Sequence, residues 1–285
     1  MNIALCFCVR NCEKYLPNIF KNIEILRKKI NFKIYCIFVY DNCSDNSEKL
    51  LINYMKKNKD NVLVKHINNE SHIRTVRIAK ARNECLNVVY NIFNNILFHI
   101  MIDSDNIGSS KWNIDVIDKY LNNFDNDNWD CISFNKKEYY DIWALLYDNF
   151  KHPCWSFGLE SATVVDFMFE DITKKIQNTK SNSIEVISAF NGFCIYKTKR
   201  FKGFYYDGLY ENFKKLVTDE ERKKTVETLK KFNINVECKD MSLTYKYRNK
   251  LILWKSYNEC CEHLYYNFSA FKKGRKIKIS KFIIN

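Results

Sequence analysis

The amino-acid sequence predicts an α/β fold that begins with a Rossmann-like half built on a mostly parallel sheet. Apolar runs and helical patterns alternate over residues 3–105, and the apolar runs lack the every-second-residue pattern of a half-exposed strand. Strands that are apolar throughout are buried on both faces, which is typical of parallel sheets covered by helices. Polar clusters follow three of the runs, at the edge where ligands of such sheets bind.

The elements of this half follow one another in a regular order. Four continuous apolar segments predict strands, at residues 3–9, 33–41, 62–67 and 96–105. Apolar residues recur at helical spacing between them, which predicts helices within residues 11–30, 47–58 and 72–93. Neither GxGxxG nor GxxxxGK[ST] occurs, which argues against an NAD enzyme and a P-loop NTPase.

The remainder of the chain shows a less regular pattern. Strands are expected at 129–134, at 184–197 with Gly192 inside, and at 234–240 and 243–247. Residues 139–150 have helical periodicity, and residues 219–233 form a charged amphipathic helix. No linker or repeat separates the two parts, so we expect one domain over residues 1–285.

Composition excludes several classes of protein. No apolar run reaches the length of ~18 residues that a membrane span needs, so no transmembrane segment is expected. The 12 cysteines lack zinc-finger spacing, and we interpret them as reduced residues of a cytoplasmic protein. The formal charge is +13, and much of it lies in residues 271–285, which we interpret as a solvated basic tail rather than a membrane or partner contact.

The strand at 96–105 ends in two carboxylates, Asp103 and Asp105, on either side of Ser104. Side chains at i and i+2 of a strand point to the same side, so both can bind one divalent cation. Hard cations such as Mn²⁺ and Mg²⁺ prefer carboxylate oxygens and leave positions for phosphate oxygens. The alternative is an Asx turn that caps the helix expected after Ser109.

Two further clusters lie where the first and second strands end. Val9 and Arg10 end the first strand, and Asp41 ends the second, where its carboxylate can accept hydrogen bonds from a base or ribose. The helix before the two aspartates carries Arg77 and Arg82, and arginine suits bidentate binding of phosphate. The alternative for these arginines is a solvated helix face.

The motifs IALCFCVRN, VYDNCSDNS, RIAKARN and MIDSDN together resemble the nucleotide-sugar half of a GT-A glycosyltransferase. More closely, they resemble the glycosyltransferases of giant DNA viruses and the fungal capsule-associated mannosyltransferase-like family. YYDIWALL, SAFNGFCIYK and CCEHLYYN extend the likeness to residue 267. Two positions depart from the family pattern, because Leu146 stands where an arginine is usual and Asn267 where the family's histidine can stand.

The resemblance implies roles for particular residues. Asp103 and Asp105 would hold Mn²⁺ or Mg²⁺, with His263 completing the metal shell. On the donor side, the implied contacts are Val9, Arg10, Asp41, Arg77, Arg82, Ser104 and Gly192. Tyr140 and Asp141 would lie on the acceptor side. The domain then divides into a nucleotide-sugar half at 1–110, an acceptor half at 111–270 and the basic tail.

The function that the resemblance implies is a metal-dependent, inverting transfer from a UDP-, GDP- or dTDP-linked sugar to a hydroxyl of a glycan, lipid or protein. An inverting transfer needs a carboxylate base, for which Glu262 is the first choice and Asp171 the second. The resemblance also implies a viral origin, with the protein in the host cytoplasm or the virion. Three alternatives stay open: a nucleotidyltransferase, a catalytically inactive GT-A scaffold, and a basic nucleic-acid-binding protein, although few motifs favour nucleic acid.

Overall fold

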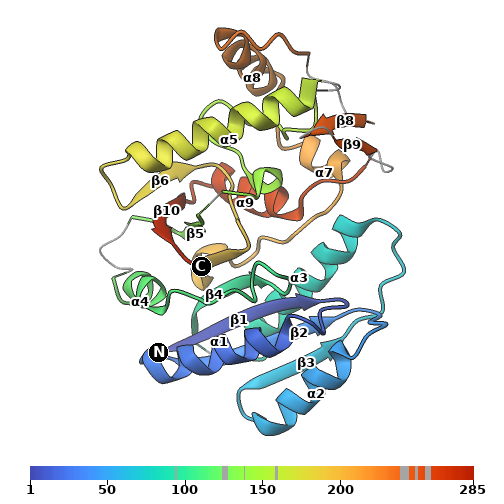
Figure 1. Cartoon of the computed structure of the whole chain (residues 1–285), viewed down its shortest axis with the longest axis vertical. Helices are drawn as coiled ribbons and strands as arrows, with labels where there is room; N and C mark the ends of the chain where they lie inside the picture. The colour runs from blue at the N-terminus through green and yellow to red at the C-terminus, as the bar shows by residue number, and fades with distance from the viewer. Residues whose placement is uncertain are drawn as a thin grey trace.

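A computed structural model describes residues 1–93, 95–123, 128–137, 139–157, 160–237, 244–247, 250–253 and 258–285. In Figure 1 the described elements form an α/β structure around one central sheet. Eight strands follow one another across this sheet in the order β3-β2-β1-β4-β7-β5-β10-β6, and β8 and β9 form a separate hairpin. Among the described residues, no helix combines the length and apolarity that crossing a membrane requires.

The first half of the chain forms the parallel part of the sheet. Its strands and helices alternate as predicted: β1 (Asn2–Val9), α1 (Leu16–Lys29), β2 (Lys33–Tyr40), α2 (Ser47–Lys57), β3 (Val62–His66), α3 (Arg74–Asn91) and β4 (Ile96–Asp103). β1 pairs in parallel with β2 and β4, and β2 pairs in parallel with β3. The predicted α/β class with a Rossmann-like parallel half is therefore confirmed.

Both faces of this sheet are covered, as the continuous apolar runs predicted. Along β1, Ile3, Leu5 and Phe7 lie in the core beneath α1 and α2. The alternate residues Ala4 and Cys6 lie in the core beneath α3. A strand buried on both sides has no face for polar residues, and this is why the sequence shows no alternation.

The second half adds strands of both directions to the same sheet: β5 (Cys131–Asn135), β6 (Ser183–Val186), β7 (Phe193–Lys197) and β10 (Ile277–Ile283). β7 runs antiparallel between β4 and β5. β10 pairs in parallel with β5 and antiparallel with β6. Because β4, β5 and β10 run in one direction, their carboxyl ends share one edge of the sheet with the beginning of β7.

Three expectations for this half are corrected. The solvated tail at 271–285 is wrong, because residues 277–283 form β10 inside the sheet. The single strand at 184–197 is two strands, separated by a turn at Asn191 and Gly192 where both φ angles are positive. The helical pattern at 139–150 forms only the short 3₁₀ helix η1 (Ile142–Ala144).

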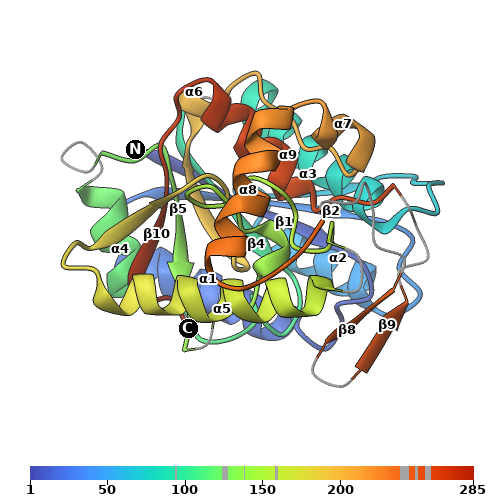
Figure 2. The ribbon, with the colours of Figure 1, turned by 90° about the horizontal axis from the view of Figure 1, so that it is seen from above.

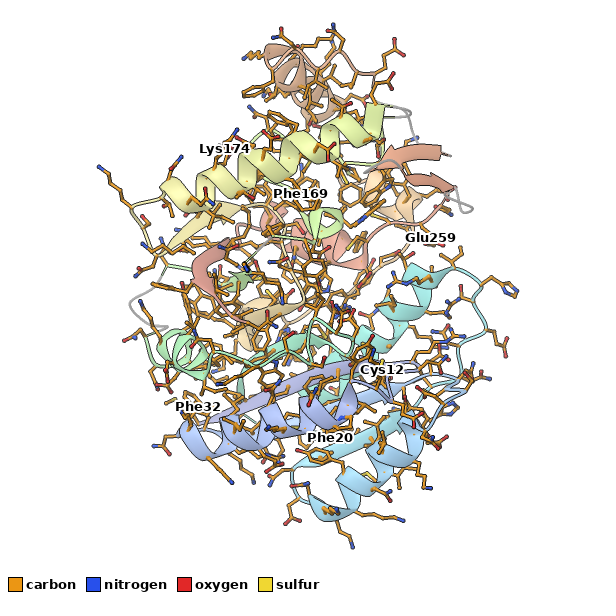
Figure 3. The ribbon with its side chains drawn as sticks, viewed as in Figure 1. Cys12, Phe20, Phe32, Phe169, Lys174 and Glu259 are labelled. Carbon is orange, nitrogen blue, oxygen red and sulfur yellow. The ribbon has the colours of Figure 1, made fainter. Side chains whose placement is uncertain are left out.

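Helices cover the second half and complete the fold: α4 (Ile114–Asn122), α5 (Ser161–Asn178), α6 (Thr198–Phe201), α7 (Tyr210–Lys214), α8 (Asp219–Lys231) and α9 (Glu262–Lys272). Figure 2 shows α5 lying along one side of the molecule, and in Figure 1 it lies next to β6, which it contacts together with β10. Figure 3 shows Lys174 of α5 pointing outward, while Phe169 lies among the side chains between the layers. The predicted helix at 219–233 is confirmed as α8.

The hairpin consists of β8 (Thr244–Tyr247) and β9 (Lys250–Leu253), paired antiparallel. The strand expected at 243–247 is therefore confirmed for residues 244–247. The strand expected at 234–240 does not form over residues 234–237, and residues 238–240 lie outside the described part of the chain.

Glu221 joins three parts of the second half, and this gives a prediction about stability. Its carboxylate bonds Lys151 and Lys272 and closes a capping box with Thr218 at the start of α8. Burial alone raises its pKa, but the bonds from Lys272, the Thr218 backbone and Lys151 lower the pKa to about 2. A depressed carboxylate pKa stabilises the fold above the unfolded pKa, and this contribution is lost as the pH falls toward the folded value.

Glu221→Gln should lower the free energy of unfolding at pH 7 by about 2 kcal/mol, and by less than half of that at pH 3, because the folded carboxyl group is protonated only as the pH approaches about 2. Urea unfolding of both proteins at several pH values measures this. The neighbouring exposed Glu220→Gln is the matched control and should leave the unfolding midpoint unchanged. A deficit of equal size at pH 7 and pH 3 would show that the ionised carboxylate is not responsible.

Candidate functional site

The candidate site lies at the edge of the sheet where β4 ends and β7 begins. Asp103 is the last residue of β4, and its backbone N–H donates to the carbonyl of Gly192 at 3.1 Å. Gly192 has a φ of 80°, and a Cβ there would lie 2.4 Å from Cγ2 of Ile107 and 2.8 Å from the Tyr140 hydroxyl. Glycine is therefore required both by the backbone conformation and by the close packing against the loop after β4.

Asp103 is held by two side chains that come from different parts of the chain. Nη2 of Arg82, on α3, lies 3.1 Å from Oδ1 of Asp103. The hydroxyl of Tyr140 donates to Oδ2 at 3.2 Å. Both oxygens are thus oriented by the protein, and Tyr140, which was expected on the acceptor side, contacts Asp103.

Asp105, unlike Asp103, is bound by no side chain among the described residues. The residue is exposed, and its Oδ1 accepts a hydrogen bond from the backbone N–H of Ile107 at 2.8 Å. Although the residue as a whole is exposed, crowding around its carboxylate and the negative charge of Asp103 raise the pKa of Asp105. The Asx-turn alternative is correct for the Ile107 bond, but the cap of the next helix is Asn113.

Arg82 and Glu262 form a buried ion pair between the two halves of the molecule. Nε of Arg82 donates to Oε1 of Glu262 at 2.8 Å, and the two side chains are 5% and 6% exposed. The guanidinium also lies 4.7 Å from the ring centroid of Phe190 and 5.8 Å from that of Tyr206. Arg82 thus links α3, the end of β4 and the start of α9.

His263 does not join the two aspartates. Its ring is buried and stacks on Phe190 with a centroid separation of 3.6 Å. Burial and the nearby charge of Arg82 lower its pKa well below the usual value, so the imidazole is neutral. Over the described ranges, no three His, Cys, Asp or Glu side chains are placed to hold a metal, so the structure does not bring His263 together with Asp103 and Asp105. Successive residues on a helix point about 100° apart, so Glu262 and His263 face different neighbours.

The two departures from the family pattern have structural roles here. Asn267 is buried, and its amide donates to the hydroxyl of Ser188 and the carbonyl of Ala189, in the segment that leads to Gly192. Leu146 pairs with Ser188 through backbone hydrogen bonds on the same segment. Both positions therefore brace the approach to the turn at Gly192 rather than contacting Asp103.

Asp41 and Ser104 each have a buried polar atom for which the described residues offer no partner. Asp41 is 5% exposed and follows the end of β2, and its Oδ1 has no hydrogen-bond partner among the described residues. Its Oδ2 lies 3.7 Å from Nη1 of Arg10, which follows Val9 at the end of β1. The hydroxyl of Ser104 is likewise buried without a partner in the described part of the chain. Buried polar groups are normally bonded, so these atoms indicate a ligand or ordered water.

Asp141 stands beside this edge in a network with Asn191. Its carboxylate accepts from the backbone N–H groups of Asn191 and Ala144, at 3.2 and 3.3 Å. The amide oxygen of Asn191 accepts from the backbone N–H groups of Tyr140 and Asp141 in return. Burial, and then the negative charges of Asp103 and Glu262, raise the pKa of Asp141 to about 7.

The sequence reasoning missed two residues, Lys136 and Asn285. Lys136 follows β5, is 8% exposed, and its ammonium donates to the side-chain oxygen of Asn285. The amide nitrogen of Asn285 donates to the carbonyl of Ile107 at 2.7 Å, in the loop between Asp105 and the next helix. The signal was available, because the strand expected at 129–134 ends just before Lys136.

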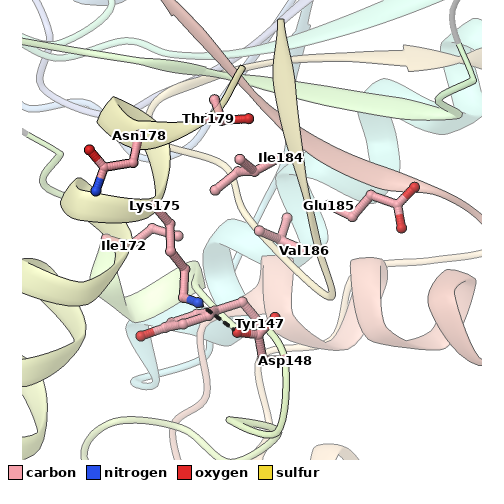
Figure 4. A pocket seen from close by; sticks show the side chains of 9 residues that line it. All are labelled: Tyr147, Asp148, Ile172, Lys175, Asn178, Thr179, Ile184, Glu185 and Val186. Atoms are coloured by element: carbon pink, nitrogen blue, oxygen red, sulfur yellow. Dashed lines mark ion pairs between the residues drawn. The ribbon is translucent and has the colours of Figure 1, made fainter. Parts of the chain in front are cut away.

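Arg77 and Asp171 are not brought to this edge. Arg77 donates to the backbone carbonyls of Ser71 and His72 and so fastens the loop before α3. Asp171 lies on α5, where its carboxylate is 3.9 Å from Lys175. Figure 4 shows Lys175 in a separate pocket, paired with Asp148 beside Tyr147 and β6.

The residues of the edge fit a divalent cation through two ligands rather than three. Asp103 and Asp105 supply carboxylate oxygens, and Mg²⁺ and Mn²⁺ commonly take their remaining ligands from phosphate and water. The carboxylates also exceed the nearby cations in the described residues, with Asp41, Asp103, Asp105, Asp141 and Glu262 against Arg10, Arg82 and Lys136. A divalent cation would offset this excess of negative charge.

Comparison with known proteins gives matches only among solved structures. S. aureus TarS 1–349 in complex with UDP-GlcNAc is 17% identical over 88% of this chain and 59% of its own, with a TM-score of 0.41. The mannosyltransferase PcManGT from Pyrobaculum calidifontis, with GDP-Man and Mn²⁺, is 11% identical over 71% of this chain and 47% of its own, with a TM-score of 0.39. Glucosyl-3-phosphoglycerate synthase from Mycobacterium tuberculosis, with Mn²⁺, UDP-Glc and phosphoglyceric acid, is 9% identical over 82% of this chain and 66% of its own, with a TM-score of 0.42.

These scores are too low to assign an activity or a residue role to this chain. The chain spans less than two thirds of the length of TarS 1–349. No protein-family model matches the sequence, and no curated protein matches it. The likeness to giant-virus and fungal glycosyltransferases therefore stays a prediction.

Proposed function

We propose that the protein is a metal-dependent GT-A-type glycosyltransferase that binds a nucleotide sugar at the carboxyl edge of β1, β2 and β4. One observation carries this proposal above all. Two carboxylates end the central parallel strand, beside a buried Asp41 oxygen and a buried Ser104 hydroxyl that have no partner among the described residues. Such an edge is where ligands of open α/β sheets bind.

The donor would lie across the ends of three strands. Asp41 has a free acceptor for a ribose hydroxyl or a base N–H, and Arg10 beside it is half exposed. Asp103 and Asp105 would hold Mn²⁺ or Mg²⁺, which would supply positive charge for the leaving diphosphate. Arg82 keeps Asp103 in place and leaves Asp105 as the open ligand.

Asp141 is a better candidate for the general base than Glu262. Glu262 is 5% exposed and its Oε1 is bound to Arg82, so it has little access to an acceptor. Asp141 is partly exposed, and its pKa of about 7 suits proton transfer near neutral pH. An inverting transfer, in which Asp141 takes the proton of the acceptor hydroxyl, is therefore our proposal for the reaction.

Binding of the donor is the direct test. Thermal unfolding of the protein with UDP-, GDP- and dTDP-linked sugars, each with and without Mn²⁺, should show a shift for one nucleotide class that depends on the metal. A ligand present at 100 times its dissociation constant adds about 2.7 kcal/mol to the stability of the native state. In a domain of this size that corresponds to roughly 5–10 °C in Tm.

Two variants make this test specific to the site. Asp105→Ala should lose the metal-dependent shift without a change in Tm of the free protein, because Asp105 is exposed. Asp60→Ala, at an exposed aspartate after α2, should keep the whole shift. Absence of a shift with every donor, together with one for RNA or DNA, would replace the enzyme proposal by nucleic-acid binding. Donor binding without transfer to any acceptor would favour an inactive scaffold.

A further inference from the structure

Lys136 has no role in the mechanism proposed above. Lys136 comes directly after β5, and β5 runs parallel to β10 and in the same direction as β4. Its side chain therefore starts at the same edge of the sheet as Asp103 and Asp105. This edge is the one where a nucleotide sugar would bind, so the inference rests on the proposed function.

Lys136 is an unusual lysine, because the residue is buried and its ammonium has one hydrogen-bond partner among the described residues. The residue is 8% exposed, and the one hydrogen bond that its ammonium donates among the described residues goes to Asn285. An ammonium has three N–H donors, so two of them have no partner in the described part of the chain. Leaving donors of a buried charged group unpaired is costly, and such groups usually have a ligand or a mechanistic role.

Contacts on two sides of Lys136 place it beside Asp103 and Asp105. Asn285 holds the ammonium with its oxygen and the carbonyl of Ile107 with its nitrogen. The backbone N–H of Ile107 in turn donates to Asp105. On the other side, the ammonium lies 5.8 Å from the ring centroid of Tyr140, whose hydroxyl binds Asp103.

We propose that Lys136 binds a phosphate oxygen of the donor's diphosphate and that Asn285 positions it for this contact. A buried ammonium with free N–H groups beside a metal motif fits an anionic oxygen. A fixed positive charge at this place stabilises the negative charge that grows on the leaving diphosphate. The protein thus supplies a second cation to the diphosphate in addition to the metal.

The nearby charges agree with a protonated lysine. Burial lowers the pKa of Lys136 to about 8, and the negative charges of Asp103 and Asp105 act in the opposite direction. The residue that follows β10 connects the segment after β4 with the end of β5. The backbone N–H of Ile284 donates to the carbonyl of Asn135 at 3.1 Å, and that of Asn113 donates to the carbonyl of Ile284 at 2.7 Å.

The test compares diphosphate with nucleoside binding, by calorimetry in the presence of Mn²⁺. UDP, GDP, uridine and guanosine are titrated into the wild type, Lys136→Met, Lys136→Arg and Asn285→Ala. Lys136→Met should weaken binding of the preferred diphosphate by about 10- to 100-fold, in the range of one charge-assisted hydrogen bond, and leave the nucleoside unchanged. Lys136→Arg should recover part of the affinity, and Asn285→Ala should give an intermediate loss.

Lys278→Met is the matched control, because Lys278 is also a largely buried lysine but pairs with Glu185 on β6. It should bind the diphosphate like the wild type. Equal affinities of wild type and Lys136→Met for the diphosphate would overturn this inference while the donor site stands. Equal losses for nucleoside and diphosphate would overturn it too, since Lys136 would then only support the fold. A wild type that binds neither nucleotide removes the proposed function itself, and this inference with it.

Discussion

Asp141→Asn should nearly abolish sugar transfer while leaving donor binding intact. Removing a general base costs about 10²- to 10⁴-fold in rate, and an amide cannot accept the proton. The donor contacts proposed for Asp41, Asp103 and Asp105 do not involve Asp141, so the metal-dependent thermal shift should be that of the wild type. Transfer in the wild type should rise with pH through about 7, because the pKa of Asp141 is raised to about 7 and only its ionised form accepts a proton.

Asp141→Asn is expected to lower the activity but to improve stability relative to the wild type as the pH rises. A carboxyl group whose pKa is raised in the folded protein stabilises the fold at low pH and loses this contribution as the pH rises through the folded value. The wild type should therefore lose about 2 kcal/mol of stability, relative to Asp141→Asn, between pH 5 and pH 8. Loss of activity with a gain of relative stability is the pattern expected of a strained catalytic group.

Rates at several pH values and urea unfolding at pH 5 and pH 8 measure both effects. Asp171→Asn, at the carboxylate on α5, is the matched control and should change neither. The assignment to Asp141 fails if Glu262→Gln, and not Asp141→Asn, removes the rising part of the pH profile. If neither carboxylate matters for the rate, the reaction does not need a protein base, as expected for a retaining transfer.

The parallel half could be predicted from the sequence because its signal is local. In a strand such as 33–40, every residue but the first few is buried, and the run of apolar residues is its direct consequence. Asp41 and Asp103 were found because they directly follow such runs. The same logic applied to β5 would have found Lys136, the residue that follows it at the same edge.

The second half could not be predicted to the same extent, because long-range pairing decides its structure. Residues 277–283 read as a basic tail, since Lys278 and Lys281 interrupt the apolar pattern, yet they form β10 between β5 and β6. The partners of β10 are more than 90 residues away, and no local pattern indicates them. His263 was misplaced for a related reason: its neighbour Phe190 is supplied by tertiary packing.

Arg82→Met should destabilise the protein by about 3–5 kcal/mol, the usual cost of removing one partner of a buried ion pair. The positive charge of Arg82 is favourable at this position. Burial lowers the pKa of Arg82, but Glu262, Cys8 and Asp103 together raise this pKa well above the usual value. Methionine fills the space between Phe190 and Tyr206 but leaves Glu262 buried without its cation. The expected loss is roughly 10 °C in Tm.

A double-mutant cycle separates the pair from the packing around it. Glu262→Leu alone leaves Arg82 with Asp103 as its one carboxylate partner among the described contacts, and should also be strongly destabilising. In Arg82→Met with Glu262→Leu, no unpaired buried charge remains at this position, so the combined loss should be at least about 2 kcal/mol smaller than the sum of the single losses. Arg200→Met is the control, because Arg200 is half exposed and its ion pair with Asp130 should cost about 1 kcal/mol or less.

The cycle also decides what Arg82 does for Asp103. In the double variant the fold is expected to recover, but of the two described side chains that bind the Asp103 carboxylate only Tyr140 remains, so the carboxylate can turn away from its wild-type position. Affinity for Mn²⁺ with the donor nucleotide should therefore stay low although the protein is folded. If stability and metal affinity recover together, Arg82 acts through the fold alone. If the single Arg82→Met variant is as stable as the wild type, the ion pair with Glu262 is not what joins α3 to α9.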